Sequence, residues 1–118
     1  MAYDPELADR LRTVLGGWDE EHEGDELGLV DEKQMFGGLG FMVAGHLAVC
    51  AGSRGDLMVR VDPADLPTLC EDDGVEPMAM AGRTSRSWVN VDPAVLSGAS
   101  LTAWVERGVA AARVAPRR

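Results

Sequence analysis

The chain has little of the material from which catalytic sites and disulfide frameworks are built. Its 118 residues include only two cysteines and two histidines, and one pair of cysteines is too few for a disulfide-built scaffold. No apolar run approaches the roughly 18 residues of a membrane-spanning helix. Residues 1–15 also lack the basic and apolar regions of a signal peptide. We therefore expect a single cytoplasmic domain over residues 1–118, with no membrane contact.

Basic residues are scarce, and the charge is unevenly placed. Eleven Lys and Arg stand against 20 Asp and Glu, for a net charge of −9. Residues 1–32 hold 11 of the acids and only two bases, which predicts a solvated acidic loop at 18–28. Residues 113–118 are interpreted as a short basic tail. This acidity, together with only three Trp, two Phe and one Tyr, argues against direct nucleic-acid binding.

The order of helices and strands can be predicted from apolar spacing and from the glycines and prolines. Asp4-Pro5 is typical of a helix start, and Gly16-Gly17 predicts its end. Apolar stretches at 29–36, 39–43, 46–51 and 56–61 follow, separated by short glycine-containing breaks. Breaks of two to four residues fit hairpins and not parallel crossovers, so these stretches predict an antiparallel meander.

A second helix is expected from Asp62-Pro63 to Cys70, and a last strand at 87–91 after a turn around Gly82. Ser100 is interpreted as the cap of the final helix. The predicted fold is therefore α+β, with the order α-β-β-β-β-α-β-α. In this fold an antiparallel sheet, made of a meander plus a later strand, has its helices packed on one face.

None of the residues able to carry chemistry lies in a catalytic pattern. His22 stands in the acidic run, but its spacing matches no calcium loop, and His46 has no activating neighbour. Cys50 and Cys70 lack a nearby base that would lower a thiol pKa, so we expect two packed free thiols, with a redox role as the alternative. We therefore predict no catalytic residue, no metal and no cofactor.

The Gly37-Gly38-Leu39-Gly40 run has the composition of a phosphate loop but the wrong surroundings. A phosphate loop leads from a strand into a helix, whereas here a strand follows the glycines. The glycines are therefore expected to serve the hairpin, through positive φ, a bulge or close backbone packing.

One set of residues resembles a known family, the TfoX/Sxy N-terminal domain. The resemblance runs from about Leu7 to about Ala112. Its motif residues are Met35, Phe36, Gly37, Gly38, Gly40, Phe41, Met42, Gly45, Arg60, Gly82, Arg83 and Trp88. It implies a small α+β domain whose antiparallel sheet is backed by helices. The founding members regulate natural competence with the cyclic-AMP receptor protein and carry a second, helical domain. No such domain is expected here, because the sequence stops at Arg118.

The resemblance implies no catalytic residues, and its motif is apolar and glycine-rich. Such a motif suits a fold, whereas an active site normally adds a titratable group. We therefore expect a non-catalytic regulatory or protein-interaction domain with an unidentified protein partner, a second copy of the chain being one candidate. The alternative is a small-molecule-binding protein or minor enzyme in which Arg60, Arg83 and Arg86 hold an anionic ligand.

Overall fold

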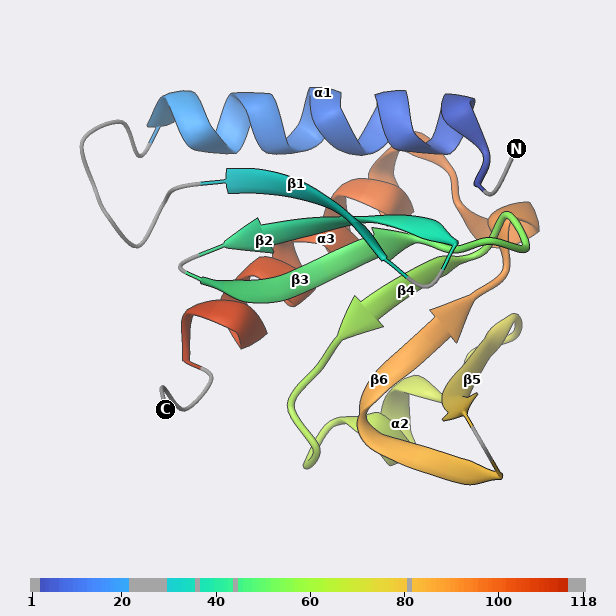
Figure 1. The fold of residues 1–118 in the computed structure, drawn as a ribbon. Helices are drawn as coiled ribbons and strands as arrows, with labels where there is room; N and C mark the ends of the chain where they lie inside the picture. Colours follow the sequence, from blue (N-terminus) through green and yellow to red (C-terminus); the bar gives the residue numbers. More distant parts are fainter. Residues whose placement is uncertain (1–2, 22–29, 36, 44, 81, 115–118) are drawn as a thin grey trace.

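The computed structural model describes residues 3–21, 30–35, 37–43, 45–80 and 82–114. Figure 1 shows one sheet with helices packed against it. The elements are α1 (Pro5–Glu21), β1 (Val30–Met35), β2 (Gly38–Val43), β3 (His46–Ala51), β4 (Leu57–Arg60), α2 (Leu66–Leu69), β5 (Val75–Met80), β6 (Arg83–Val91), the 3-10 turn η2 (Pro93–Val95) and α3 (Gly98–Arg113). No helix in the described ranges is long and apolar enough to cross a membrane.

The predicted α+β class and order of elements are confirmed, and the sheet gains a strand. Its six strands lie in the order β1-β2-β3-β4-β6-β5, and all five neighbouring pairs are antiparallel. The meander is β1 to β4. β5 lies where only a lead-in to the Gly82 turn was expected, and β6 begins at Arg83, earlier than the predicted residue 87. Gly82 has a φ of 78°, a conformation that glycine adopts without strain.

The prediction that Gly16-Gly17 ends the first helix is wrong. α1 continues to Glu21, so the first part of the predicted acidic loop, 18–21, is helical, while 22–28 lies outside the described residues. A glycine costs a helix interior only about 1 kcal/mol relative to alanine. Burial of Leu7, Leu11 and Leu15 beneath this helix outweighs that cost. Of the predicted tail, Arg113 closes α3 and 115–118 are not described.

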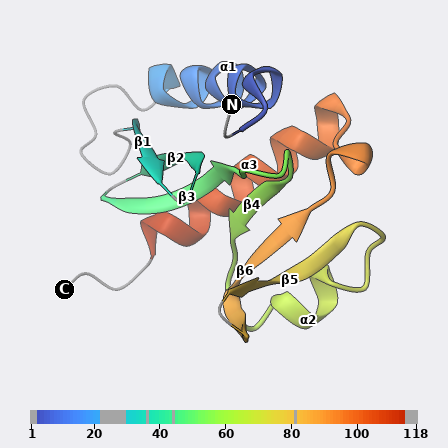
Figure 2. The same cartoon turned by 45° about the vertical axis from the view of Figure 1, so that its right-hand side comes forward.

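Helix α3 packs across the middle of the sheet, against β2, β3 and β4, and also contacts α1. Its cap is Ser97 and not Ser100. Ser97 Oγ accepts a hydrogen bond from Ser100 N at 3.2 Å, and Ser100 Oγ accepts one from Ser97 N at 2.8 Å. This reciprocal pair satisfies two amides that the helix start leaves without partners. Figure 2 shows α3 against the sheet and α1 along its β1 side.

The two faces of the sheet have different roles. Side chains alternate between faces along a strand, and paired residues share a face. One face carries Leu39, Phe41, Val49, Val59, Val89 and Val91, all in the hydrophobic cluster to which α1 contributes Leu11, α2 Leu69 and α3 Val105. The described helices therefore bury their apolar side chains on this face. We call the opposite side of the sheet the open face.

Candidate functional site

The open face carries a row of residues that β-pairing aligns across five strands. Gly40 pairs with Cys50, Cys50 with Met58, Met58 with Asn90, and Asn90 with Glu76. Cys50 is buried but is not part of the core cluster, as expected for a residue on the other side of the sheet. Met42, Met58, Met78 and Trp88 are half-buried. The open face is thus methionine-rich and partly accessible.

Two adjoining hollows lie on this side of the molecule. The first, of about 220 Å³, is lined by Gly38, Cys50, Gly52, Ser53, Arg54, Asp56, Met58, Met78, Ala79 and Asn90. The second, of about 450 Å³, is lined by Arg54, Asp56, Gly74, Glu76, Asn90, Asp92 and Pro93. They share Arg54, Asp56 and Asn90, so we treat them as one depression, the Asn90 hollow. Three carboxylates and one guanidinium line it.

Asn90, which lines both parts of the hollow, has a buried side-chain oxygen without a partner. Its Oδ1 is the buried side-chain nitrogen or oxygen that finds no hydrogen-bond partner among the described residues. A buried acceptor without a donor costs about 1–3 kcal/mol, so most such groups in folded proteins are paired. The Asn90 oxygen is thus an exception among the buried polar side-chain atoms that the structure describes.

The β3–β4 turn positions Asp56 beside the same hollow. Gly52 N donates to Asp56 O at 2.8 Å and Gly55 N donates to Gly52 O at 3.0 Å. Asp56 Oδ1 lies so close to Gly52 that a Cβ there would collide with it. Gly52 thus permits a carboxylate at the rim.

The thiol of Cys50 is poorly suited to nucleophilic chemistry. Burial, and to a smaller extent the Asp56 carboxylate, together raise the pKa of Cys50 to about 11. The thiolate is the reactive form, so at neutral pH this group is a packed thiol. Burial likewise raises the pKa of Cys70. Both cysteines are free, as predicted.

Arg60, one of the three predicted anion-binding residues, makes its contacts within the chain. Its Nε donates to Leu47 O at 2.6 Å, and its guanidinium lies 5.1 Å from the centre of the Trp88 ring. Burial lowers its pKa. Backbone acceptor and aromatic ring together fix this side chain. It lines a third hollow of about 400 Å³ with Val61, Asp62, Pro63, Ser87, Ala111 and Val114.

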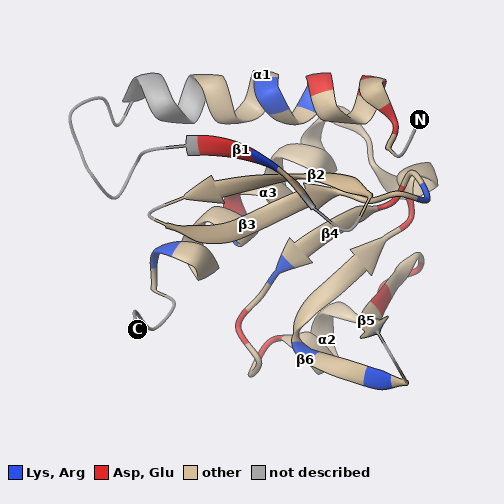
Figure 3. Ribbon diagram, in the orientation of Figure 1, with Lys and Arg blue, Asp and Glu red and all other residues tan. Residues whose placement is uncertain are grey.

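Arg83 and Arg86 lie on β6, both exposed, and neither lines the hollow beside Arg60. Arg83 pairs with Met80 next to the Gly82 turn, whereas Arg60 pairs with Trp88 farther along β6. Figure 3 shows basic positions spaced along β6 and acidic ones interspersed on α1 and β1. This placement does not gather the three arginines around one described hollow.

The glycine motif lies mainly around the hairpins. Gly37 and Gly45 have φ of 74° and 83° at the β1–β2 and β2–β3 turns. Gly38 is needed for close approach, because a Cβ there would collide with Ala51 O and lie 3.2 Å from Cys50 Sγ. Among the remaining motif residues, Phe41 is buried in the core, whereas Gly40 and Met42 lie on the open face. Met35 is the last residue of β1, and Phe36 lies outside the described residues.

The histidines do not add to the site. His46 begins β3 and is partly exposed, and His22 lies outside the described residues. Among the residues that the structure describes, no three His, Cys, Asp or Glu side chains are grouped to hold a metal ion.

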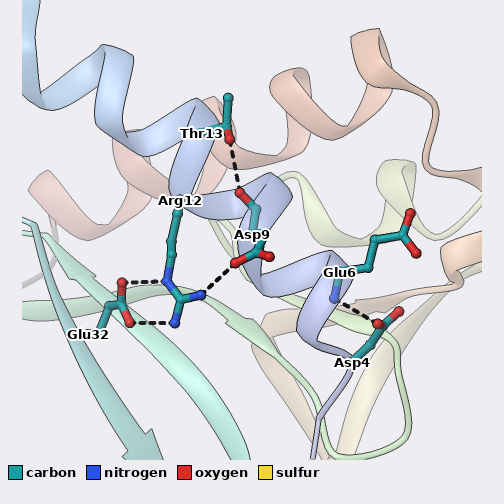
Figure 4. Close-up of polar contacts among 6 residues, drawn as sticks. All are labelled: Asp4, Glu6, Asp9, Arg12, Thr13 and Glu32. Carbon is teal, nitrogen blue, oxygen red and sulfur yellow. Dashed lines mark hydrogen bonds and ion pairs between the residues drawn. The ribbon is translucent and has the colours of Figure 1, made fainter.

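An ion-pair network joins α1 to β1 at the sheet edge. Arg12 Nε and Nη2 donate to the two Glu32 oxygens at 2.8 and 2.9 Å, and Nη1 donates to Asp9 Oδ1 at 2.8 Å (Figure 4). The hydrogen bonds from Arg12 lower the pKa of Glu32. Exposed charged residues on an edge strand also oppose pairing with another sheet. This network therefore holds α1 to β1 and protects the exposed edge of the sheet from pairing with another strand.

Comparison with protein-family models identifies the family of the chain. The model of the TfoX N-terminal domain matches residues 24–112, so the chain belongs to the TfoX N-terminal domain family. The comparisons with curated proteins and with solved structures found no match.

The residues that line the Asn90 hollow were missed at the sequence level. Asp56 comes from a turn and Glu76 from a strand, and neither belongs to a motif. Asn90 lies in the Trp88–Asp92 stretch that carries the family resemblance, but it was not singled out as a site residue. The one available signal was Asn90 itself, because asparagine is depleted within strands.

Proposed function

We propose that this chain is a non-catalytic protein-interaction domain, regulatory in role, and that it binds its partner through the open face. The observation that carries this is the asymmetry of the sheet. The described helices bury their apolar side chains on one face, whereas Met42, Met58, Met78 and Trp88 are only half-buried on the other. Methionine and aromatic side chains are enriched in protein interfaces, and methionine adapts its shape to a partner.

The chemistry of the face supports binding over catalysis. The Cys50 thiol is held protonated by burial, and Arg60 is engaged by Leu47 O and Trp88. A catalytic site needs a nucleophile or acid–base group whose pKa is tuned toward neutrality. The shift at Cys50 runs in the opposite direction.

Partner capture with matched variants tests this function. The tagged full chain is crosslinked in extract of its source cells, and recovered proteins are compared for wild type, Met42→Gln, Met58→Gln and the control Val114→Gln. Val114 is 80% exposed at the end of α3, so its change removes apolar surface elsewhere. We expect the two open-face variants to lose the partner and the control to keep it.

Sedimentation at several concentrations identifies the case in which the partner is a second copy of the chain. In that case the open-face variants lower the dimer fraction and Val114→Gln does not. Equal recovery from all four proteins, with their melting temperatures unchanged, contradicts the proposed function.

A further inference from the structure

Arg60 carries a charge that the described residues hold in place but do not neutralise. Arg12, by comparison, forms ion pairs with both Glu32 and Asp9. Among the described residues no Asp or Glu forms an ion pair with Arg60, whose Nε donates instead to the carbonyl oxygen of Leu47. Burial lowers the pKa of Arg60, whereas the two carboxylates raise the pKa of Arg12. A half-buried cation without a counter-ion is stabilised by an anion that pairs with it.

The two end nitrogens of this guanidinium are unpaired and accessible. Nη1 and Nη2 of Arg60 form no hydrogen bond with the residues that the structure describes. The buried side-chain nitrogen or oxygen that lacks a partner among those residues is Asn90 Oδ1, so Nη1 and Nη2 are not buried. Asp62, the nearest acid along the chain, caps Ala64 N at 2.9 Å instead of pairing with Arg60. Both end nitrogens are therefore open to a ligand.

The contacts that Arg60 does make hold its guanidinium in one orientation. Its Nε donates to Leu47 O at 2.6 Å, and its central carbon lies 5.1 Å from the centre of the Trp88 ring. These contacts leave the end that carries Nη1 and Nη2 available. Two parallel N–H donors on a guanidinium match the two oxygens of a carboxylate. Because the side chain is already ordered, this pairing costs little conformational entropy.

The surroundings of Arg60 belong to the open face. Alternation along β4 places Arg60 on the same side of the sheet as Met58, and Arg60 pairs with Trp88 on β6. Leu47, whose carbonyl oxygen it contacts, pairs with Met42. These four neighbours are all half-buried. A partner that covers them would exclude water from around the guanidinium, and exclusion of water strengthens a charged hydrogen bond.

We propose that Nη1 and Nη2 of Arg60 bind the carboxylate of an aspartate or glutamate side chain supplied by the protein partner. The carboxylate accepts from both nitrogens, while apolar groups of the partner contact Trp88 and Met58. One guanidinium neutralises one negative charge, whereas a doubly charged phosphate would leave excess negative charge on a chain whose net charge is already −9. This inference rests on the proposed function and names the chemical group that the open face recognises.

Side-chain and amide chemical shifts of the isotope-labelled full chain provide the test. The probe is N-acetyl-glutamate methylamide, compared with N-acetyl-glutamine methylamide, which has nearly the same shape without the charge. We expect saturable shifts at the Arg60 Nε–H and the Trp88 indole N–H, and about tenfold weaker binding of the glutamine compound. The absence of saturable shifts with the glutamate probe, or equal binding of both compounds, overturns the inference.

A second arginine that lies over a tryptophan ring provides the matched control. Arg60→Gln should weaken binding of the glutamate probe about tenfold. Arg60→Lys keeps the charge but loses the paired end nitrogens, so it should also weaken binding. Arg107 lies 4.7 Å from the centre of the Trp104 ring but is exposed, on α3, and Arg107→Gln should bind as wild type does. Equal weakening by Arg107→Gln, or wild-type binding by either Arg60 variant, overturns the inference.

Two further probes distinguish the source of the anion. Propionate carries the same carboxylate without a peptide backbone, and methyl phosphate carries the alternative anion. Tighter binding of either one than of the blocked glutamate overturns the assignment to an acidic side chain of a partner protein. In the partner capture, Arg60→Gln should lose the partner and Arg107→Gln should keep it. Full recovery with Arg60→Gln likewise overturns the inference.

The inference and the proposed function fail separately. If partner capture depends on Met58 but the glutamate probe does not bind, the inference falls and the proposed function stands. If the glutamate probe binds at Arg60 but capture ignores the open face, the proposed function falls, and with it the partner as source of the carboxylate.

Discussion

The replacement Gly108→Ala should destabilise the protein even though alanine is the better helix former. Gly108 lies within α3, where the helix meets β3. A Cβ at this position would be 2.6 Å from Ala48 O and 2.7 Å from Val49 Cγ1. Ordinary carbon–oxygen contacts begin at about 3.3 Å, so the helix must move away from the strand by about 0.7 Å. A gap of this size forfeits a quarter to a half of each dispersion contact along the interface.

The magnitude follows from two opposing terms. Overpacking of a tight core costs about 1–3 kcal/mol, and the upper end applies because one obstacle is backbone. Replacing a helical glycine with alanine returns about 1 kcal/mol. We expect a net loss of about 2 kcal/mol in the free energy of unfolding, or about 8 °C in melting temperature at about 4 °C per kcal/mol.

Gly16→Ala is the matched control. Gly16 is also a helix-interior glycine, but a Cβ there meets nothing within 4 Å. It should therefore gain up to about 1 kcal/mol from propensity alone. Urea unfolding followed by tryptophan fluorescence measures the free energy of unfolding of both variants. The m-value should be the same for both variants and the wild type. Wild-type or greater stability of Gly108→Ala would refute the close-packing argument. An equal loss at Gly16→Ala would show that alanine is harmful for another reason.

Three further outcomes are expected. Gly38→Val should lower the free energy of unfolding by about 2 kcal/mol, because a Cβ there collides with Ala51 O; an unchanged melting temperature contradicts this. Cys50 should resist iodoacetamide until the pH approaches its pKa of about 11, and Asp56→Asn should lower that pH; rapid alkylation at pH 7 by mass spectrometry is the contrary result. Glu32→Gln should cost stability above the usual glutamate pKa, because Arg12 lowers the pKa of Glu32. This difference should vanish as the pH falls through that lowered pKa and should shrink with added salt; a difference that persists in acid rules out the ion pair as its source.

Local patterns were sufficient to predict the sheet and its hairpins. Alternation at Leu57, Val59 and Val61 and the short glycine breaks depend only on neighbouring residues, and the structure confirms the strands they predict. The same local reasoning ended α1 too early at Gly16-Gly17 and missed strand β5. That strand contains Pro77, which cannot donate to a neighbouring strand, and β5 tolerates it because it lies at the edge of the sheet.

The sequence by itself determined the family, the α+β class and the meander, because these follow from apolar period, turn residues and a contiguous motif. Only the tertiary structure decided what lies on the open face. Asp56, Glu76 and Asn90 are brought together by the pairing of β4, β5 and β6. Tertiary packing likewise decided that Gly108 is required, since the atoms its Cβ would meet belong to β3. Contacts between residues distant along the chain depend on strand register and helix placement, and no local spacing encodes them.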